Sequence, residues 1–205
     1  MKEDLFGKVD SKYYDHPCNI FALDEYRKDG GQDEFSRKQV WFYVYGDDEL
    51  EKFFETELRE LIDDRFVDDS IEWDLITLYP THVKGEINSN MQKLMKSISS
   101  AKGISYRQVL ERNKTIQENH ELESVKSKLI NLENSLDVKE FEEKNVIIVD
   151  NISLTGTSIL HGANKLLENG AENVFGVCLG LGASFPGKKQ IERGKKASEL
   201  MKDEQ

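Results

Sequence analysis

The chain has 205 residues, of which 38% are hydrophobic and 33% are charged, a length that suits one domain with a sizeable core. Its formal net charge of −11 at pH 7 argues against nonspecific binding to nucleic acid, which needs a basic face, but it leaves room for a small anionic ligand. There is no run of 18 apolar residues and no apolar leader, and the two cysteines lack the spacing of a zinc site, so we expect a cytoplasmic protein without a membrane span.

The first strong strand signal lies at Val40–Tyr45, which is rich in β-branched and aromatic residues and is ended by Gly46. We predict a strand there and treat residues 1–39 as an N-terminal extension of unclear role. Asp47 is a suitable N-cap for an amphipathic helix over residues 48–64, because apolar residues follow it at helical spacing.

The middle of the chain alternates between apolar and highly polar segments. Trp73–Tyr79 predicts a second strand that Pro80 stops, and Met91–Ser99 predicts a helix. Residues 104–138 are dense in Glu, Lys and Asn but keep apolar residues at helical spacing. We interpret them as a mobile, partly helical insert; the alternative is a solvated surface helix without a role.

The third strand is Asn145–Val149, an apolar run of the kind that is buried on both faces of a parallel sheet. The amphipathic helix Ser158–Asn169 and the strand Val174–Leu179 follow it, and together they make a right-handed βαβ unit. We therefore predict an α/β fold, a parallel sheet flanked by helices, over residues 40–185, followed by a tail at 186–205.

The segment from Asp150 to Ser158 lies at the carboxyl end of a buried strand and opens a helix, which is where ligands collect in an α/β sheet. The first N–H groups of that helix lack internal partners and carry the positive end of its dipole, so a phosphate would satisfy them. Gly156 permits a close approach, and hydroxyl groups at Thr155 and Thr157 add donors. The carboxylate of Asp150 would repel phosphate but suits sugar hydroxyls. This polarity predicts a phosphorylated sugar; the alternative is an ordinary βα turn with a Ser or Thr cap.

The same segment resembles the phosphoribosyl pyrophosphate motif of type I phosphoribosyltransferases: an apolar run, two acidic residues, a few variable positions, Thr-Gly and a hydroxyl residue. Within that group the chain is similar to the ComF-like branch, because Val109–Gln117 resembles that branch's Leu-x-Arg…Thr…Gln stretch. The match is strong over residues 145–180 and weaker over 73–139. The zinc-binding cysteines that are common near the start of ComF-like proteins are absent.

The resemblance implies a type I phosphoribosyltransferase-like, Rossmann-like fold that binds phosphoribosyl pyrophosphate or a nucleotide, and it implies a homodimer. Ribose hydroxyls would fall to Asp150 and Asn151, while Mg²⁺ would be held through the pyrophosphate and the ribose, near Asp150, without direct protein ligands. The 5′-phosphate would lie on a turn made of Ser153, Leu154, Thr155, Gly156, Thr157 and Ser158.

The pyrophosphate would meet the turn that follows the second strand. This turn contains Thr81, His82, Lys84 and Gly85. The alternative for His82 is a surface histidine. Three cations of the insert would close over the pyrophosphate as a lid that excludes water; they are Arg107, Arg112 and Lys114. The alternative for each of them is a solvated charge.

Two departures from the family pattern bear on activity. Asn151 stands in place of a second acid and removes a negative charge that would stabilise an oxocarbenium-like transition state. Leu154 stands where 6-oxopurine salvage enzymes place an aspartate, so salvage of hypoxanthine or guanine is disfavoured.

Two functions stay open at this stage. One is an enzyme that transfers the phosphoribosyl group to a nitrogen acceptor and releases pyrophosphate. The other is a catalytically weak or inactive regulatory protein that binds the same ligand and acts through a partner in competence or defence. A generic nucleotide-binding domain is a third idea, and the absence of the P-loop and Gly-x-Gly-x-x-Gly patterns counts against it.

Overall fold

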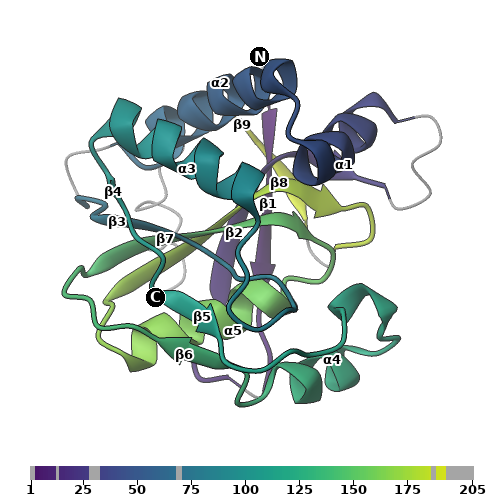
Figure 1. The fold of residues 1–205 in the computed structure, drawn as a ribbon, viewed down its shortest axis with the longest axis vertical. Helices are drawn as coiled ribbons and strands as arrows, with labels where there is room; N and C mark the ends of the chain where they lie inside the picture. Colours follow the sequence, from purple (N-terminus) through teal and green to yellow (C-terminus); the bar gives the residue numbers. More distant parts are fainter. Residues whose placement is uncertain (1–2, 13, 28–32, 68–70, 186–187, 193–205) are drawn as a thin grey trace.

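Seven strands form the central sheet of the computed structural model, which describes residues 3–12, 14–27, 33–67, 71–185 and 188–192 (Figure 1). Their order across the sheet is β4 (Ser105–Tyr106), β3 (Leu75–Leu78), β7 (Asn145–Ser153), β8 (Asn173–Gly182), β2 (Cys18–Tyr26), β1 (Glu3–Val9) and β9 (Lys189–Glu192). Neighbouring strands from β4 to β2 are parallel, whereas β1 pairs antiparallel with both β2 and β9. The prediction of an α/β fold with a mainly parallel sheet is confirmed.

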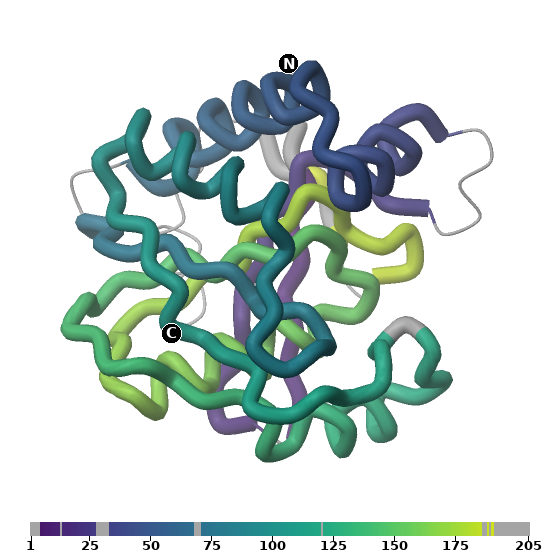
Figure 2. Tube along the Cα trace, in the orientation of Figure 1, coloured from purple at the N-terminus to yellow at the C-terminus, as the bar shows by residue number. Residues whose placement is uncertain are grey.

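Helices cover both faces of this sheet (Figures 1 and 2). On one face lie α1 (Glu34–Tyr45), α2 (Asp48–Arg65) and α3 (Ser89–Lys102), and on the other lies α5 (Thr157–Glu168) with α4 (Val125–Leu132) beside it. Successive residues of a strand point to opposite faces, so β7 contributes to two separate cores. Ile147 and Val149 belong to the core under α1–α3, while Val146 and Ile148 belong to the core under α5.

Several local predictions agree with the observed elements. The helix expected over residues 48–64 is α2, and the side chain of Asp47 caps it by accepting from the N–H groups of Glu49 and Leu50. The other agreements are β3 within Trp73–Tyr79, α3 around Met91–Ser99, β7 from Asn145, α5 near Ser158–Asn169 and β8 around Val174–Leu179.

The strand predicted at Val40–Tyr45 is wrong, because these residues are the last turns of α1. The helix begins with an N-cap in which the side chain of Asp33 accepts from the N–H of Ser36, and Gly46 ends it as a left-handed C-cap. Ser36, Gln39 and Phe42 are buried at a spacing of three residues, whereas the β-branched and aromatic residues between them are largely exposed. Burial of this helical stripe outweighed the strand preference of the local composition.

Residues 1–39, which we had set apart as an extension, contribute two strands to the central sheet within the described range. β2 lies between β8 and β1, with Ala22 opposite Cys178. Ile20, Phe21 and Ala22 are fully buried. The described N-terminal strands therefore belong to the same folded core as the βαβ unit, and the sequence pattern missed them.

The insert at 104–138 is built into the structure. It begins with β4 at the sheet edge and then forms a small antiparallel sheet of β5 (Leu110–Arg112) and β6 (Leu136–Val138), with a 3₁₀ helix η1 (Asn119–Glu121) and α4 between them. Val109, Leu110 and Leu136 are buried in the core under α5. The segment is partly helical, as predicted, and it packs against α5 and forms a wall of the cavity described next.

Nowhere in the described parts of the chain does a helix combine the length and the apolar character that crossing a bilayer requires. The predicted tail at 186–205 lies outside the described residues apart from 188–192, where β9 extends the sheet.

Candidate functional site

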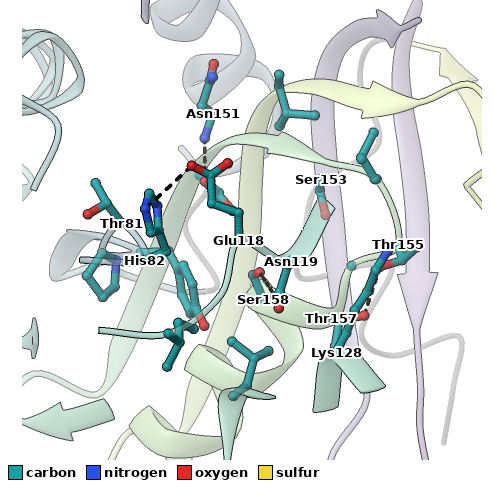
Figure 3. Close-up of a pocket in the computed structure, with 18 of the residues that line it drawn as sticks. Thr81, His82, Glu118, Asn119, Lys128, Asn151, Ser153, Thr155, Thr157 and Ser158 are labelled. Carbon is teal, nitrogen blue, oxygen red and sulfur yellow. Dashed lines mark hydrogen bonds and ion pairs between the residues drawn. The ribbon is translucent and has the colours of Figure 1, made fainter. Parts of the chain in front are cut away.

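A cavity of about 560 Å³ opens at the carboxyl ends of β3 and β7 (Figure 3). Its walls come from α1, from the turn after β3, from residues 116–119, from α4, and from the whole of segment 150–158 between β7 and α5. Strand ends and a helix start thus face one cavity, the arrangement that an α/β sheet offers to a ligand.

Helix α5 begins without a side-chain cap. Its N-cap residue, Gly156, has φ 74° and ψ −7°, a left-handed conformation that glycine adopts without steric cost. Glycine offers no side chain to cap the helix, and Gly156, Thr157 and Ser158 line the cavity, so the start of the helix and the positive end of its dipole face the cavity wall. The hydroxyl groups of Thr155 and Thr157 bond each other at 2.8 Å beside this opening. This geometry can accept an anion.

Two glycines allow the turn to pack closely against neighbouring strands. A Cβ on Gly156 would lie 2.7 Å from the Cβ of Val9 at the end of β1. A Cβ on Gly182 in β8 would lie 2.9 Å from the backbone oxygen of Leu154. The turn is therefore held from both sides, and a larger residue at either glycine would push it out of place.

Asp150 ends the apolar run of β7 and lines the floor of the cavity as a half-buried side chain. Its Oδ1 accepts from the N–H of Asn151 at 2.7 Å. Burial raises the pKa of this carboxyl from 3.8 to about 7, and the hydrogen bond from Asn151 and the charge of Arg112 oppose that shift. A carboxyl that titrates near neutral pH and faces a cavity is a candidate ligand-binding group.

Asn151 and Ser153 are both buried, and the side chain of Asn151 is already engaged. Gln39 of α1 donates from Nε2 to the backbone oxygen of Asn151 at 2.6 Å and to its Oδ1 at 3.1 Å. Asn151 and Ser153 line the cavity as predicted, but the amide oxygen expected to meet a ribose hydroxyl is bound to α1. Because Gln39 lies in the segment predicted as an extension, no sequence signal linked it to this site.

Replacing Gln39 with alanine should lower the free energy of unfolding by about 2 kcal/mol, because two buried acceptors lose their donor. It should also weaken ligand binding by loosening the end of β7. Urea denaturation measures the first effect and calorimetry the second. Arg37→Ala is the control, since Arg37 is exposed on the same helix and its removal should change neither quantity.

The turn after β3 is only partly at the cavity. Thr81 and His82 line it, whereas Lys84 and Gly85 do not. Gly85 has φ +69° and donates its N–H to the backbone oxygen of Arg112 at 3.0 Å, so the tight backbone expected there is present. Lys84 is exposed to solvent.

The three cations expected in a lid have three different environments. Arg112 lines the cavity but is 2% exposed, and it donates from Nε to the oxygen of Thr81 at 3.0 Å and from a terminal nitrogen to Ser135 Oγ at 2.5 Å. It is therefore a fixed buried charge in the wall. Lys114 and Arg107 lie outside the cavity lining. Lys114 donates to a backbone oxygen at the end of α4, and Arg107 pairs with Glu143 at 2.8 Å.

Sequence reasoning did not nominate several polar residues of the cavity wall, among them Tyr43, Glu118, Asn119 and Lys128. Lys128 is 8% exposed and lines the same cavity as Thr157, so it adds a positive charge to the wall that contains the start of α5 (Figure 3). Its only sequence signal is its position next to Leu129, on the buried stripe of α4, where a lysine is unusual. The other three residues follow no periodic pattern.

The wall toward α5 contains neutral groups. The hydroxyl of Tyr79 lies 3.3 Å from Nδ1 of His161, and burial lowers the pKa of His161 to about 3, so the ring is uncharged at neutral pH. Burial also raises the pKa of Tyr79, whose ring lies 5.2 Å from the Arg112 guanidinium. The fixed positive charge on the buried side of the cavity therefore comes from Arg112 and Lys128.

No family model and no curated protein sequence matches the chain. Among solved structures, the chain is similar to the structure of the allosteric regulatory enzyme of purine biosynthesis, with 16% sequence identity and a TM-score of 0.42. The match covers 67% of this chain and 29% of that chain, so the chain spans less than a third of that protein's length. A likeness this distant carries nothing about activity, so function is inferred from the geometry of the cavity.

Proposed function

We propose that this chain binds a phosphorylated ribose, with phosphoribosyl pyrophosphate as the best match, as a type I phosphoribosyltransferase-like protein. One observation carries the proposal: the uncapped start of α5 and the carboxyl of Asp150 open into the same cavity. A helix start attracts an anion, whereas a carboxylate repels anions and accepts hydrogen bonds from hydroxyl groups. A sugar phosphate presents both kinds of group at a fixed separation. It therefore matches this polarity better than inorganic phosphate or an uncharged sugar does.

The proposed binding mode follows the charges of the wall. The 5′-phosphate lies on the N–H groups of the turn, with the hydroxyl of Thr157 and the charge of Lys128 beside it. The ribose lies over Asp150. The pyrophosphate extends toward His82 and Arg112, at the carboxyl end of β3. This order runs along the cavity from the start of α5 to the turn after β3. The residues assigned to it, Thr157, Lys128, Asp150, His82 and Arg112, all line the cavity.

The oxygen donors of the site fit Mg²⁺ carried in with the ligand. Among the described residues, no three His, Cys, Asp or Glu side chains converge to hold a metal ion. The ion would therefore be held mainly by oxygens of the pyrophosphate and the ribose, with Asp150 near it. When bound, Mg²⁺ would neutralise part of the pyrophosphate charge.

As an enzyme, the protein would join a nitrogen acceptor to the anomeric carbon of the ribose. The new C–N bond forms as the C–O bond to pyrophosphate breaks, and the acceptor loses a proton to solvent. Positive charge would develop on the sugar, and the carboxylate of Asp150 would stabilise it. Most of the catalysis would come from positioning the two reactants. Leu154 offers no proton to the acceptor, so 6-oxopurines are disfavoured.

The second candidate is a regulatory protein that binds this ligand without turnover. Its specific support is that the amide of Asn151 replaces an acid and is tied to Gln39, which leaves the turn with one carboxylate. Membership of the ComF-like branch, a homodimer and a cytoplasmic location belong to the same proposal, and they rest on the resemblance and the composition.

Radiolabelled phosphoribosyl pyrophosphate with Mg²⁺ and a panel of nitrogenous bases separates the two candidates. Pyrophosphate release that depends on a base supports the enzyme, and tight binding without release supports the regulatory protein. If the ligand does not bind at all, the proposed function is wrong.

Asn151→Asp should raise base-dependent pyrophosphate release by about tenfold, because it returns a negative charge near the sugar, and a tenfold rate corresponds to about 1.4 kcal/mol. Gln39 can still donate to an aspartate oxygen, so the fold should be preserved. The release assay above measures the effect. Asn134→Asp makes the same charge change at an exposed position outside the cavity and should leave the rate unchanged.

A further inference from the structure

A short strap, residues 116–119, crosses the cavity between the turn after β3 and the start of α5. At one end, the N–H of Ile116 donates to the backbone oxygen of His82 at 2.9 Å. At the other end, Asn119 donates from Nδ2 to Ser158 Oγ at 3.1 Å (Figure 3). The strap therefore joins the two turns to which the proposed function assigns the pyrophosphate and the 5′-phosphate, and it passes over the space between them.

Helix α4 holds the strap from outside. Asn131 donates from Nδ2 to the backbone oxygen of Gln117 at 2.8 Å and to Asn119 Oδ1 at 3.0 Å. Its own Oδ1 accepts from the N–H of Gln117 at 3.3 Å. With both ends and the middle bonded to three different elements, the strap keeps the residue between Gln117 and Asn119 in one place.

That residue is Glu118, which lines the cavity. Its Oε1 lies 3.5 Å from Nε2 of His82, and its side chain is 41% exposed at the lining of the cavity. The charges of Asp150 and Glu118 both contribute to raising the pKa of Tyr43 to about 12, after the larger effect of burial. Glu86 contributes to this shift as well. Tyr43, Asp150 and Glu118 all line the same cavity, with one carboxylate on its floor and one on the strap.

We infer that Glu118 is a second sugar-binding carboxylate, which accepts a hydrogen bond from a ribose hydroxyl on the side opposite Asp150. The inference rests on the proposed function, since a ribose whose phosphate lies on α5 would occupy the space between floor and strap. The segment 150–158 provides one carboxylate and a tied amide, and the strap adds the second acceptor. The site therefore selects sugar phosphates with free hydroxyls over inorganic phosphate.

Glu118→Gln tests this, because glutamine keeps the length and the contact with His82 but removes the charged acceptor. Calorimetry with ribose 5-phosphate, 2-deoxyribose 5-phosphate and inorganic phosphate measures the three affinities. We expect the affinity for ribose 5-phosphate to fall about tenfold, the range for a hydrogen bond to a charged group, and that for inorganic phosphate to stay the same. Glu123→Gln removes the same charge at an exposed residue outside the cavity and should change nothing.

The ligand panel separates the failures. An unchanged affinity of Glu118→Gln for ribose 5-phosphate overturns the inference and leaves the proposed function standing. An equal loss for ribose 5-phosphate and inorganic phosphate also overturns it, because Glu118 would then only support the strap. If the natural chain binds neither sugar phosphate, the proposed function fails, and the inference fails with it. Binding of 2-deoxyribose 5-phosphate that Glu118→Gln no longer weakens would identify the 2-hydroxyl as the group that Glu118 contacts.

Discussion

Gly156→Val is expected to abolish detectable binding of ribose 5-phosphate and to lower the free energy of unfolding by about 2–5 kcal/mol. Valine is strained at φ 74°, and its side chain would collide with that of Val9, whose Cβ lies 2.7 Å from the position of an added Cβ. Relief of the collision must move the turn. Once the turn moves, the N–H groups at the start of α5 no longer converge on one point, and a phosphate loses several donors together.

Gly103→Val is the matched control for this prediction. Gly103 ends α3 with φ +72°, and an added Cβ there meets nothing within 4 Å. The control variant therefore has the backbone strain but no collision, and Gly103 lies outside the cavity lining. We expect it to lower the stability of the fold and to leave ligand binding intact. Thr155→Ala combined with Thr157→Val complements it by removing two hydroxyl groups at an unchanged backbone. If all of these variants bind ribose 5-phosphate like the natural chain, α5 does not hold the phosphate.

Asp150→Asn should weaken binding of ribose 5-phosphate by about tenfold or more, and at the same time stabilise the unliganded protein at pH 8. The amide can still accept the hydrogen bond from the N–H of Asn151, which lies 2.7 Å from Oδ1. What it loses is the charge that suits sugar hydroxyls. The folded variant is stabilised at pH 8, because neutral asparagine avoids the free-energy cost of a charged, half-buried carboxyl.

The pH dependence gives this prediction its sign. Burial raises the pKa of Asp150 in the folded chain to about 7, against 3.8 as the ordinary value. Between these two pH values the unfolded carboxyl is ionised while the folded one keeps its proton. The folded state therefore binds more protons, and stability falls as the pH rises from about 4 to 7. Asp150→Asn removes this slope, so the variant and the natural chain should be similar in stability near pH 4 and diverge toward pH 8.

Urea denaturation at several pH values measures the stability curve, and calorimetry at pH 8 measures the affinity. Asp15→Asn is the control, because Asp15 is exposed and remote from the cavity lining, and it should alter neither curve. A variant that loses stability at pH 8 and keeps its affinity would show that Asp150 is a structural residue. A gain in stability together with a loss of affinity would show that Asp150 serves ligand binding at a cost to the stability of the fold.

The segment from β7 to α5 was predictable because its information is local. An apolar run marks a strand buried on both faces, a glycine at positive φ marks the turn, and an amphipathic stripe marks the helix. Because the polar residues of segment 150–158 follow the apolar run directly, they must lie at the carboxyl end of the strand. Thr81 and His82 were expected at the site from the family resemblance alone, and both line the cavity.

The opposite wall of the cavity was not predictable in this way. Val40–Tyr45 has the composition of a strand, and its helical structure depends on the burial of Gln39 and Phe42 beneath it. β2 joins the sheet through β8, with Ile20 opposite Gly176, and no local pattern encodes a pairing over that sequence distance. Polar residues of the insert reach the cavity only because α4 and Asn131 hold them there.

The sequence by itself determined the strand, turn and helix around Asp150–Ser158 and the mainly parallel α/β core, because strand burial, helix period and turn chemistry act within a dozen residues. Only the tertiary structure decided which residues surround that turn: Gln39 behind Asn151, Lys128 beside α5 and Glu118 in the strap. Those three positions depend on packing between segments that are distant in the chain, where each contact is selected by the burial and hydrogen bonding of the whole fold.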